Sequence, residues 1–298
     1  MNRTILYFSI ISFLFFSSCS TKLSNIEDKT PEQIKETYRI LKDVAYGPDG
    51  DQKMDVYLSD IAKSYGDSNY TIIFLHGGGY YVSDKSEEEN YIEPFLKKGL
   101  NVINLNYRLK RGVPIATSDL TNALNFLIKH NIVYDMDIEN VILTGFSSGA
   151  NIATNVGLTQ NNPEYPHPLN EGMNITGIIN FSGPVDGLNL VEKIFTESEI
   201  PFLGEIGKAL FPGTEGFESK KMTSIYEPIT YFDKNDPPIF LWHGGKDFQI
   251  PPVTFDKFIP MLDEEKDVII FSPNGKHAPN KEEMKEAYTQ IFTFLDNL

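Results

Sequence analysis

The sequence is poor in three features, and each shortage excludes a class of protein or site. It has one cysteine, Cys19, so no disulfide can form within one copy, and neither a thiolate zinc cluster nor an iron–sulfur site can be built. Its 26 basic residues face 41 acidic ones, a formal charge of −15, which argues against nucleic-acid binding and against adhesion to anionic lipid by charge alone. It also lacks the run of ~18 apolar residues that a membrane-spanning helix needs.

The rest of the composition is that of a folded globular protein. Of the 298 residues, 41% are apolar and 12% are aromatic, which is more aromatic content than a disordered chain carries. This length allows one large domain or two small ones, and single α/β domains often exceed 250 residues. We therefore expect one domain.

The first nineteen residues have the pattern of a targeting segment. Arg3 is followed by an apolar run over residues 5–16, then by two serines and Cys19. The run is too short to span a bilayer but has the length of a signal-peptide core. The arrangement resembles a bacterial lipoprotein signal, in which the cysteine becomes the lipidated first residue; the alternative is a plain secretory signal with an incidental cysteine.

The lipoprotein interpretation predicts how the chain is processed and where it is held. We expect residues 1–18 to be removed as a signal peptide and residues 19–36, which are polar, to form a tether. The protein would then be exported and held at a bacterial membrane, periplasmic or at the cell surface, by lipid on Cys19. Residues 37–298 are expected to form the folded domain.

From residue 37 onward, short apolar runs alternate with longer amphipathic stretches. Most of the runs are continuously apolar, which is typical of strands covered on both faces in a parallel sheet. The run around Asp55 and Tyr57 alternates and suits an antiparallel position near the edge. We therefore predict an α/β fold with a mostly parallel, doubly wound sheet and helices on both faces. The expected strands are residues 53–58, 71–75, 101–105, 141–144, 176–181, 238–242 and 268–271, and the expected helices are residues 88–98, 118–130, 148–160, 253–264 and 281–298.

One segment, residues 184–236, separates two of these strands by far more than an ordinary connection. It carries many apolar residues, including several phenylalanines. A long insert with its own amphipathic pieces is typical of a lid or binding flap, whereas a structural excursion that packs on the body is the alternative. We expect a flap.

The strongest chemical motif follows the strand at residues 141–144. Gly145, Phe146, Ser147, Ser148 and Gly149 form G-x-S-x-G between a strand and a helix, the context in which a nucleophilic serine is raised on a tight turn. The alternative is a glycine-rich turn without chemistry. With this context the motif predicts Ser147 as a nucleophile.

A second motif, His76 followed by three glycines, comes at the end of the strand at residues 71–75. Glycines leave backbone N–H groups open to a ligand oxygen, so Gly78 and Gly79, together with the N–H of Ser148, are expected to form an oxyanion hole. A phosphate-binding loop is the rival interpretation, but no Gly-Lys-Ser/Thr follows. His76 is expected to brace the loop.

A nucleophilic serine needs a base and an orienting acid. Among the five histidines, His277 follows the last expected strand, where the chain order Ser, acid, His places the base. Asp247 lies five residues beyond the preceding strand and is the expected acid. The other acids considered are Asp186, Glu227, Asp233 and Asp236.

Together these motifs resemble an α/β-hydrolase of the carboxylesterase type, similar to bacterial feruloyl- and acetyl-esterase-like enzymes and to the hormone-sensitive-lipase-like esterases. The resemblance covers about residue 42 to the C-terminus. Phe146 departs from the aspartate that the hormone-sensitive-lipase group has before its nucleophile, and Tyr80 from the tryptophan frequent in the feruloyl-esterase type. The segments that carry it are residues 76–79, 106–109, 145–149 and 243–247 with His277.

The resemblance implies hydrolysis of carboxylic esters through a Ser147–His277–Asp247 triad and an acyl-enzyme, with no metal and no organic cofactor. The expected partners are small-molecule or carbohydrate-linked esters of small acyl or aryl acids, with no nucleic acid. Two alternatives stay open: an amidase or peptidase of the same fold, and a non-catalytic surface lipoprotein.

Overall fold

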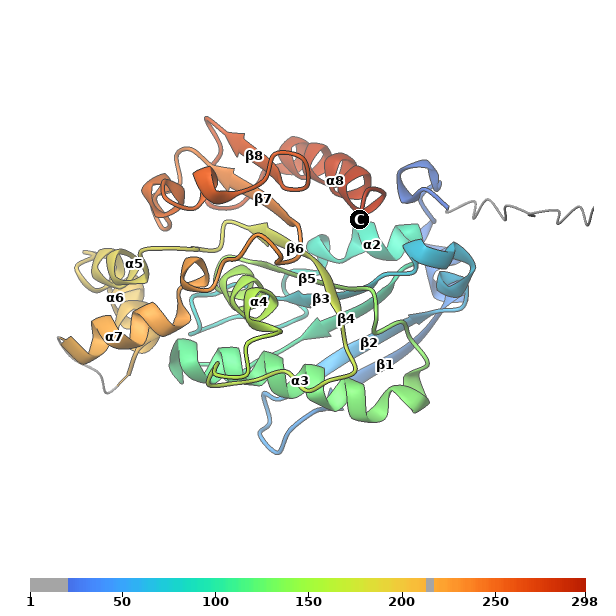
Figure 1. Cartoon of the computed structure of the whole chain (residues 1–298), viewed down its shortest axis with the longest axis horizontal. Helices are drawn as coiled ribbons and strands as arrows, with labels where there is room; N and C mark the ends of the chain where they lie inside the picture. Colours follow the sequence, from blue (N-terminus) through green and yellow to red (C-terminus); the bar gives the residue numbers. More distant parts are fainter. Residues whose placement is uncertain (1–20, 213–216) are drawn as a thin grey trace, which may run out of the picture.

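The computed structural model describes residues 21–212 and 217–298. Eight strands in these ranges form one sheet in the order β1-β2-β4-β3-β5-β6-β7-β8 (Figure 1). β1 is antiparallel to β2 and β2 is antiparallel to β4, whereas all the pairs from β4 to β8 are parallel. The strands are β1 (Tyr38–Ala45), β2 (Lys53–Ser59), β3 (Thr71–Leu75), β4 (Asn101–Leu105), β5 (Val141–Phe146), β6 (Ile175–Phe181), β7 (Ile239–Gly244) and β8 (Val268–Ser272).

Helices cover both faces of the sheet, as predicted (Figure 1). In β3, Ile73 and Leu75 pack in one buried cluster with α3 (Gly112–Tyr134) and α4 (Ser148–Thr159). Ile72 and Phe74 point to the opposite face and join the cluster made with α2 (Glu93–Lys98) and α8 (Lys281–Leu295). Because both faces are buried, every position of this strand is apolar or fully packed. The predicted α/β fold, a mostly parallel sheet between two layers of helices, is therefore confirmed.

The largest differences from the sequence-based prediction are at β1 and at residues 253–264. β1 was not predicted: it is an edge strand, and most of its side chains are exposed, whether apolar or charged. The helix expected at residues 253–264 is wrong: two 3₁₀ turns, η5 (Pro252–Phe255) and η6 (Ile259–Met261), occupy it. Prolines at the start of both turns lack the N–H that a continuous α-helix needs.

The insert at residues 184–236 forms α5 (Leu188–Thr196), α6 (Pro201–Leu210), α7 (Phe217–Tyr226) and the turn η4 (Pro228–Thr230). These helices gather at one end of the sheet, at the left of Figure 1. α5 buries Leu188, Val191 and Phe195, which lie three and four residues apart and so share one face. That face is turned toward the body of the protein.

The segment expected as a tether, residues 19–36, packs on the domain over its described part. It contains the turn η1 (Leu23–Asn25) and leads into α1 (Pro31–Thr37). Leu23 is fully buried, and its amide donates to the Asp296 carboxylate beyond the end of α8. The two ends of the described chain therefore lie side by side (Figure 1).

The predicted signal peptide, residues 1–18, and Cys19 lie outside the described residues. Within those residues, no helix combines the length and the apolarity needed to cross a membrane. The two remaining short elements are the turns η2 (Ala62–Ser68) and η3 (Glu89–Tyr91).

Candidate active site

Ser147 lies at the turn between β5 and α4, with φ 53° and ψ −118°. This conformation is strained for a residue with a side chain, and it persists only where the surroundings enforce it. Two glycines allow that crowding: a Cβ at Gly145 would lie 2.5 Å from the Gly149 carbonyl carbon, and one at Gly149 would lie 2.2 Å from the Leu75 carbonyl oxygen. The motif's glycines are thus required by close backbone approach.

Three of the residues singled out in the sequence meet at this turn. The Nε2 atom of His277 is 2.8 Å from Ser147 Oγ, and its Nδ1 atom is 2.7 Å from Asp247 Oδ2. The three residues are at most 9% exposed. They come from the ends of β5, β7 and β8, which lie at one edge of the sheet because those strands are parallel.

Asp247 is held in place by its own loop. Its Oδ1 atom accepts hydrogen bonds from the amides of Gln249, at 2.8 Å, and Ile250, at 3.0 Å, while Oδ2 faces His277. A Cβ at Gly244 would lie 2.0 Å from the Lys276 carbonyl oxygen, so only glycine lets the two loops approach. The acid and the base are therefore fixed relative to each other.

The four other acids considered from the sequence have different partners. Asp186 pairs with Lys257, Glu227 accepts from the Leu188 amide, and Asp233 and Asp236 share a turn. The structure brings Asp247, and none of these four, to His277.

Two further histidines lie near the triad without contacting Ser147. His243 is buried, with Nδ1 4.0 Å from Asp247 Oδ2, and burial lowers its pKa to about 4. His76 is fully buried; its Nδ1 lies 2.7 Å from the Gly77 carbonyl oxygen, and its ring stacks on Tyr107. Burial lowers the pKa of His76 as well. Both rings are neutral at pH 7 and pack the loops that carry the site.

The glycine loop presents its amides in three different ways. Gly78 and Gly79 have φ values of +101° and +62°, which glycine adopts without strain. The Gly77 amide donates to Glu88 Oε2 at 2.9 Å, and the Gly79 amide donates to the Ser148 hydroxyl at 3.0 Å. Gly78 lines the pocket, and the Ser148 amide begins α4, where a helix has no acceptor of its own for it.

Two contacts of this loop were not foreseen from the sequence. Tyr107 places its hydroxyl 3.1 Å from the Ser148 Oγ atom and 3.0 Å from the His76 carbonyl oxygen, which ties the loop to the elbow. Glu88 belongs to the acidic run at residues 87–89, which has the composition of a solvated surface. The sequence carries no signal that distinguishes its middle member.

A pocket of about 500 Å³ opens above Ser147 and His277. The insert, predicted as a flap, supplies one wall from the apolar faces of α5 and α6. Phe202 and Phe248 line the pocket and are also 48% and 66% exposed, so they form its rim together with Lys276. The wall residues are Leu188, Val191, Phe195, Leu203, Ile206 and Leu210. Among the described residues, no three His, Cys, Asp or Glu side chains converge as metal ligands.

Comparison with known proteins shows which family this chain belongs to. Residues 54–259 match the family model BD-FAE. The chain belongs to the BD-FAE family. This is an esterase family with the α/β-hydrolase fold, so the predicted resemblance to carboxylesterase-type α/β-hydrolases is confirmed.

Individual members are distant in sequence. The chain is 24% identical over 211 residues to endo-1,4-beta-xylanase B of Butyrivibrio fibrisolvens, covering 65% of this chain and 30% of that protein. It is 23% identical to a probable carboxylic ester hydrolase, LipM, of Mycobacterium tuberculosis, covering 68% of this chain and 48% of that one. The BD-FAE chain thus spans less than half the length of both relatives.

A solved structure extends the likeness to almost the whole fold. A truncated form of a carbohydrate esterase from gut microbiota superimposes with a TM-score of 0.68 at 21% identity, covering 89% of this chain and 99% of that one. At this identity the likeness concerns the fold.

Proposed function

We propose that this BD-FAE protein is a serine esterase that hydrolyses carboxylic esters through an acyl-enzyme. The observation that carries the proposal is the hydrogen-bonded chain from Asp247 through His277 to Ser147, held at a strained turn beneath an apolar pocket. A nucleophile, a base and an orienting group in this order are the elements that acyl transfer requires.

In the proposed first step, the Ser147 oxygen attacks the ester carbonyl carbon and His277 Nε2 takes the hydroxyl proton. Asp247 holds the Nδ1–H tautomer and stabilises the charge of the imidazolium. When the tetrahedral intermediate collapses, His277 gives the proton to the departing alcohol. Water then attacks the acyl-enzyme with the same base, which releases the acid and restores Ser147.

The negative oxygen of each tetrahedral intermediate would be stabilised by the amides of Gly78, Gly79 and Ser148. The Gly79 amide already donates to the Ser148 hydroxyl, so its N–H would be shared between that hydroxyl and the oxyanion. Removing one such donor typically costs a factor of about 10²–10³ in kcat.

The substrate we propose is an ester of an apolar acyl or aryl acid, with a carbohydrate as one class of alcohol. The apolar walls from α5 and α6 support the first part, because they match an apolar group of the substrate. Relatives named as a xylanase and as a carbohydrate esterase support the second part. A panel of acyl-chain, aryl and acetylated-sugar esters, run beside the matched amides, separates an esterase from an amidase.

Replacing the nucleophile tests the mechanism. Ser147→Ala is expected to lower kcat by about 10⁴-fold or more, because only the oxyanion donors and substrate binding would remain. It should also abolish labelling by a fluorophosphonate probe. The exposed Ser86→Ala serves as control and should keep the wild-type rate. Near wild-type turnover by Ser147→Ala would contradict the assignment.

We further propose that Cys19 is the lipid-attachment residue and that the protein is a membrane-anchored lipoprotein of the periplasm or the cell surface. The signal-like pattern before Cys19 and the absence of any other cysteine in the sequence support it. Membrane fractionation of Cys19→Ser is the test.

A further inference from the structure

A carboxylate lies directly behind the loop that carries the proposed oxyanion donors. Glu88 Oε2 accepts the Gly77 amide at 2.9 Å, and its other oxygen would be 3.2 Å from a Cβ at Gly77. The Phe146 ring covers the same glycine, with its Cδ1 atom 2.9 Å from that Cβ position. The centroids of the Phe146 and His277 rings are 5.0 Å apart. Gly77 is therefore enclosed between Glu88 and the residue that precedes the nucleophile.

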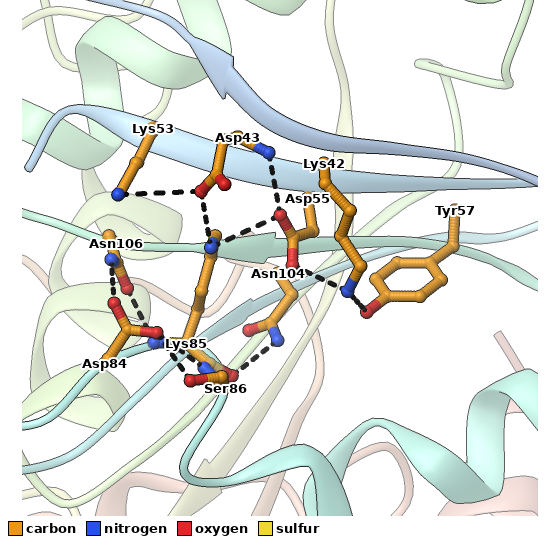
Figure 2. Close-up of polar contacts among 10 residues, drawn as sticks. All are labelled: Lys42, Asp43, Lys53, Asp55, Tyr57, Asp84, Lys85, Ser86, Asn104 and Asn106. Carbon is orange, nitrogen blue, oxygen red and sulfur yellow. Dashed lines mark hydrogen bonds and ion pairs between the residues drawn. The ribbon is translucent and has the colours of Figure 1, made fainter.

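The loop that carries Glu88 is itself anchored to the sheet. Lys85 reaches from this loop to Asp43, at 2.9 Å, and to Asp55, at 3.3 Å (Figure 2). The Lys85 and Asp55 side chains are only 7% and 3% exposed, so water screens the pair weakly. The Lys85 amide also donates to Asn106 beyond β4 at 2.6 Å (Figure 2). These bonds fix the loop three residues before Glu88 against β1, β2 and β4.

The hydrogen bond from the Gly77 amide to Glu88 thus joins two loops. One is the anchored loop that carries Lys85 and Glu88, and the other is the glycine loop that carries the amides of Gly78 and Gly79. A displacement of about 1 Å at an oxyanion donor is enough to lower a rate substantially. Glu88 is not one of the three proposed triad residues, and it does not line the pocket.

We propose that Glu88 is a positioning residue: its ionised carboxylate, by accepting the Gly77 amide, holds the glycine loop where Gly78 and Gly79 face the oxyanion. This inference rests on the proposed esterase function and names a part of the same site. It adds a group that responds to pH, because a carboxylate is a stronger acceptor than a neutral carboxyl group.

The surroundings of Glu88 place its titration near neutrality. Burial raises the pKa of Glu88 to about 7, the Gly77 hydrogen bond opposes that rise, and the Glu87 charge adds to it. The other ionisable groups that face it are Tyr91 of η3 and Tyr107 beyond β4. Burial raises the pKa of both tyrosines, so they stay neutral. As the pH falls below about 7, Glu88 takes up a proton and its hold on Gly77 weakens.

Two substitutions of Glu88 separate the effect of its hydrogen bond to Gly77 from the effect of its side-chain size. Glu88→Ala removes the acceptor and should lower kcat about tenfold or more with little change in KM, because the oxyanion donors act in the transition state. Glu88→Gln keeps an uncharged acceptor, as protonated Glu88 does, and should recover only part of that loss. The exposed neighbour Glu89→Gln is the matched control and should behave as wild type.

The acid limb of the rate provides the second readout. Above pH 7 the wild type, with Glu88 ionised, should turn over faster than Glu88→Gln. The ratio of the two kcat values should fall toward one as the pH falls below about 7, because protonated Glu88 is also a neutral acceptor. Taking the ratio removes the pH dependence that both proteins share. If Glu88→Ala kept wild-type kcat, or if this ratio did not change with pH, the proposal would be overturned.

A stability measurement tests the Glu88 contact independently of turnover. The folded-state pKa of Glu88 is raised above its unfolded value of about 4.3, so the associated stability is present below that value and lost as pH rises through about 7. The Tm of the wild type relative to Glu88→Gln should therefore fall between pH 5 and pH 8. A constant Tm difference would overturn the proposed titration. A wild type that hydrolyses no ester would instead refute the proposed function, and the Tm result would still stand.

Discussion

Asp247 shows how much of the site depends on single atoms. One of its oxygens is occupied by two backbone amides, and the other is left for the Nδ1–H of His277. Because the carboxylate accepts only, it selects the imidazole tautomer whose Nε2 atom can take the proton of Ser147. The loop after β7 therefore determines a protonation state as well as a position.

Asp247→Asn is the substitution that isolates this role. The amide oxygen can still accept from Gln249 and Ile250, which turns the NH₂ group toward His277 and favours the wrong tautomer. We expect kcat to fall by about 10³–10⁴-fold, as for the equivalent change in a serine-protease triad, with the fold intact. Steady-state kinetics and thermal unfolding are the measurements. The exposed Asp256→Asn is the control, and a variant that keeps more than a tenth of kcat would contradict the assignment.

At the scale of elements, the insert shapes the pocket. The helices α5 and α6 turn their apolar faces toward Ser147, so their side chains determine how much of the 500 Å³ is open to the substrate. The apolar residues of this segment indicated amphipathic pieces and a flap. They did not show what those faces pack against, because that depends on where the carboxyl ends of β5 and β6 place the chain.

Filling the pocket from α5 should change which acyl groups are accepted. Val191 lines the pocket and is 2% exposed, whereas its neighbour Leu190 is 38% exposed and points away. We expect Val191→Trp to lower kcat/KM for butyrate and longer esters at least about tenfold more than for acetate, because the larger side chain takes the space of the acyl chain. Leu190→Trp should leave the preference unchanged. Equal preferences in the two variants would exclude α5 as the acyl wall.

At the scale of the whole molecule, the two ends of the described chain are held together. Leu23 is buried near α8, and Asp28 pairs with Lys98 at 2.9 Å. The body of the domain therefore begins close after Cys19 in the sequence, and the expected tether is largely part of the fold from residue 21 onward. If Cys19 carries lipid, as we propose, the catalytic body is joined to the membrane over few residues.

The anchoring proposal predicts where two variants are found after fractionation. Wild-type protein should sediment with membranes and incorporate labelled fatty acid, because lipid on Cys19 would hold it there. Its net acidic charge gives no electrostatic attraction to anionic lipid, so charge alone would not produce this result. Cys19→Ser should lose the label and leave the membrane fraction, or remain unprocessed. Ser20→Ala is the control. Lipid label on Cys19→Ser would show that another residue is modified.

The fold and Ser147 could be predicted because they depend on local patterns, whereas Asp247 and His277 were predicted from the chain order serine, acid, histidine. Buried parallel strands are continuously apolar, and a strained turn between a strand and a helix needs glycine on both sides of Ser147, so these features are written in consecutive residues. β1 and the 3₁₀ turns η5 and η6 were missed, since an exposed edge strand and proline-interrupted turns have no clear period.

What the sequence determined by itself was the fold class and the tight turn at Ser147, because these follow from periodicity and from short-range sterics. Only the tertiary structure decided the distances at His277, the role of α5 and α6 as pocket walls, and the partial burial of Glu88 behind Gly77. These depend on contacts between residues far apart in the chain, whose free energy comes from desolvation and packing. No local pattern of residue types records which of three consecutive glutamates is partly buried.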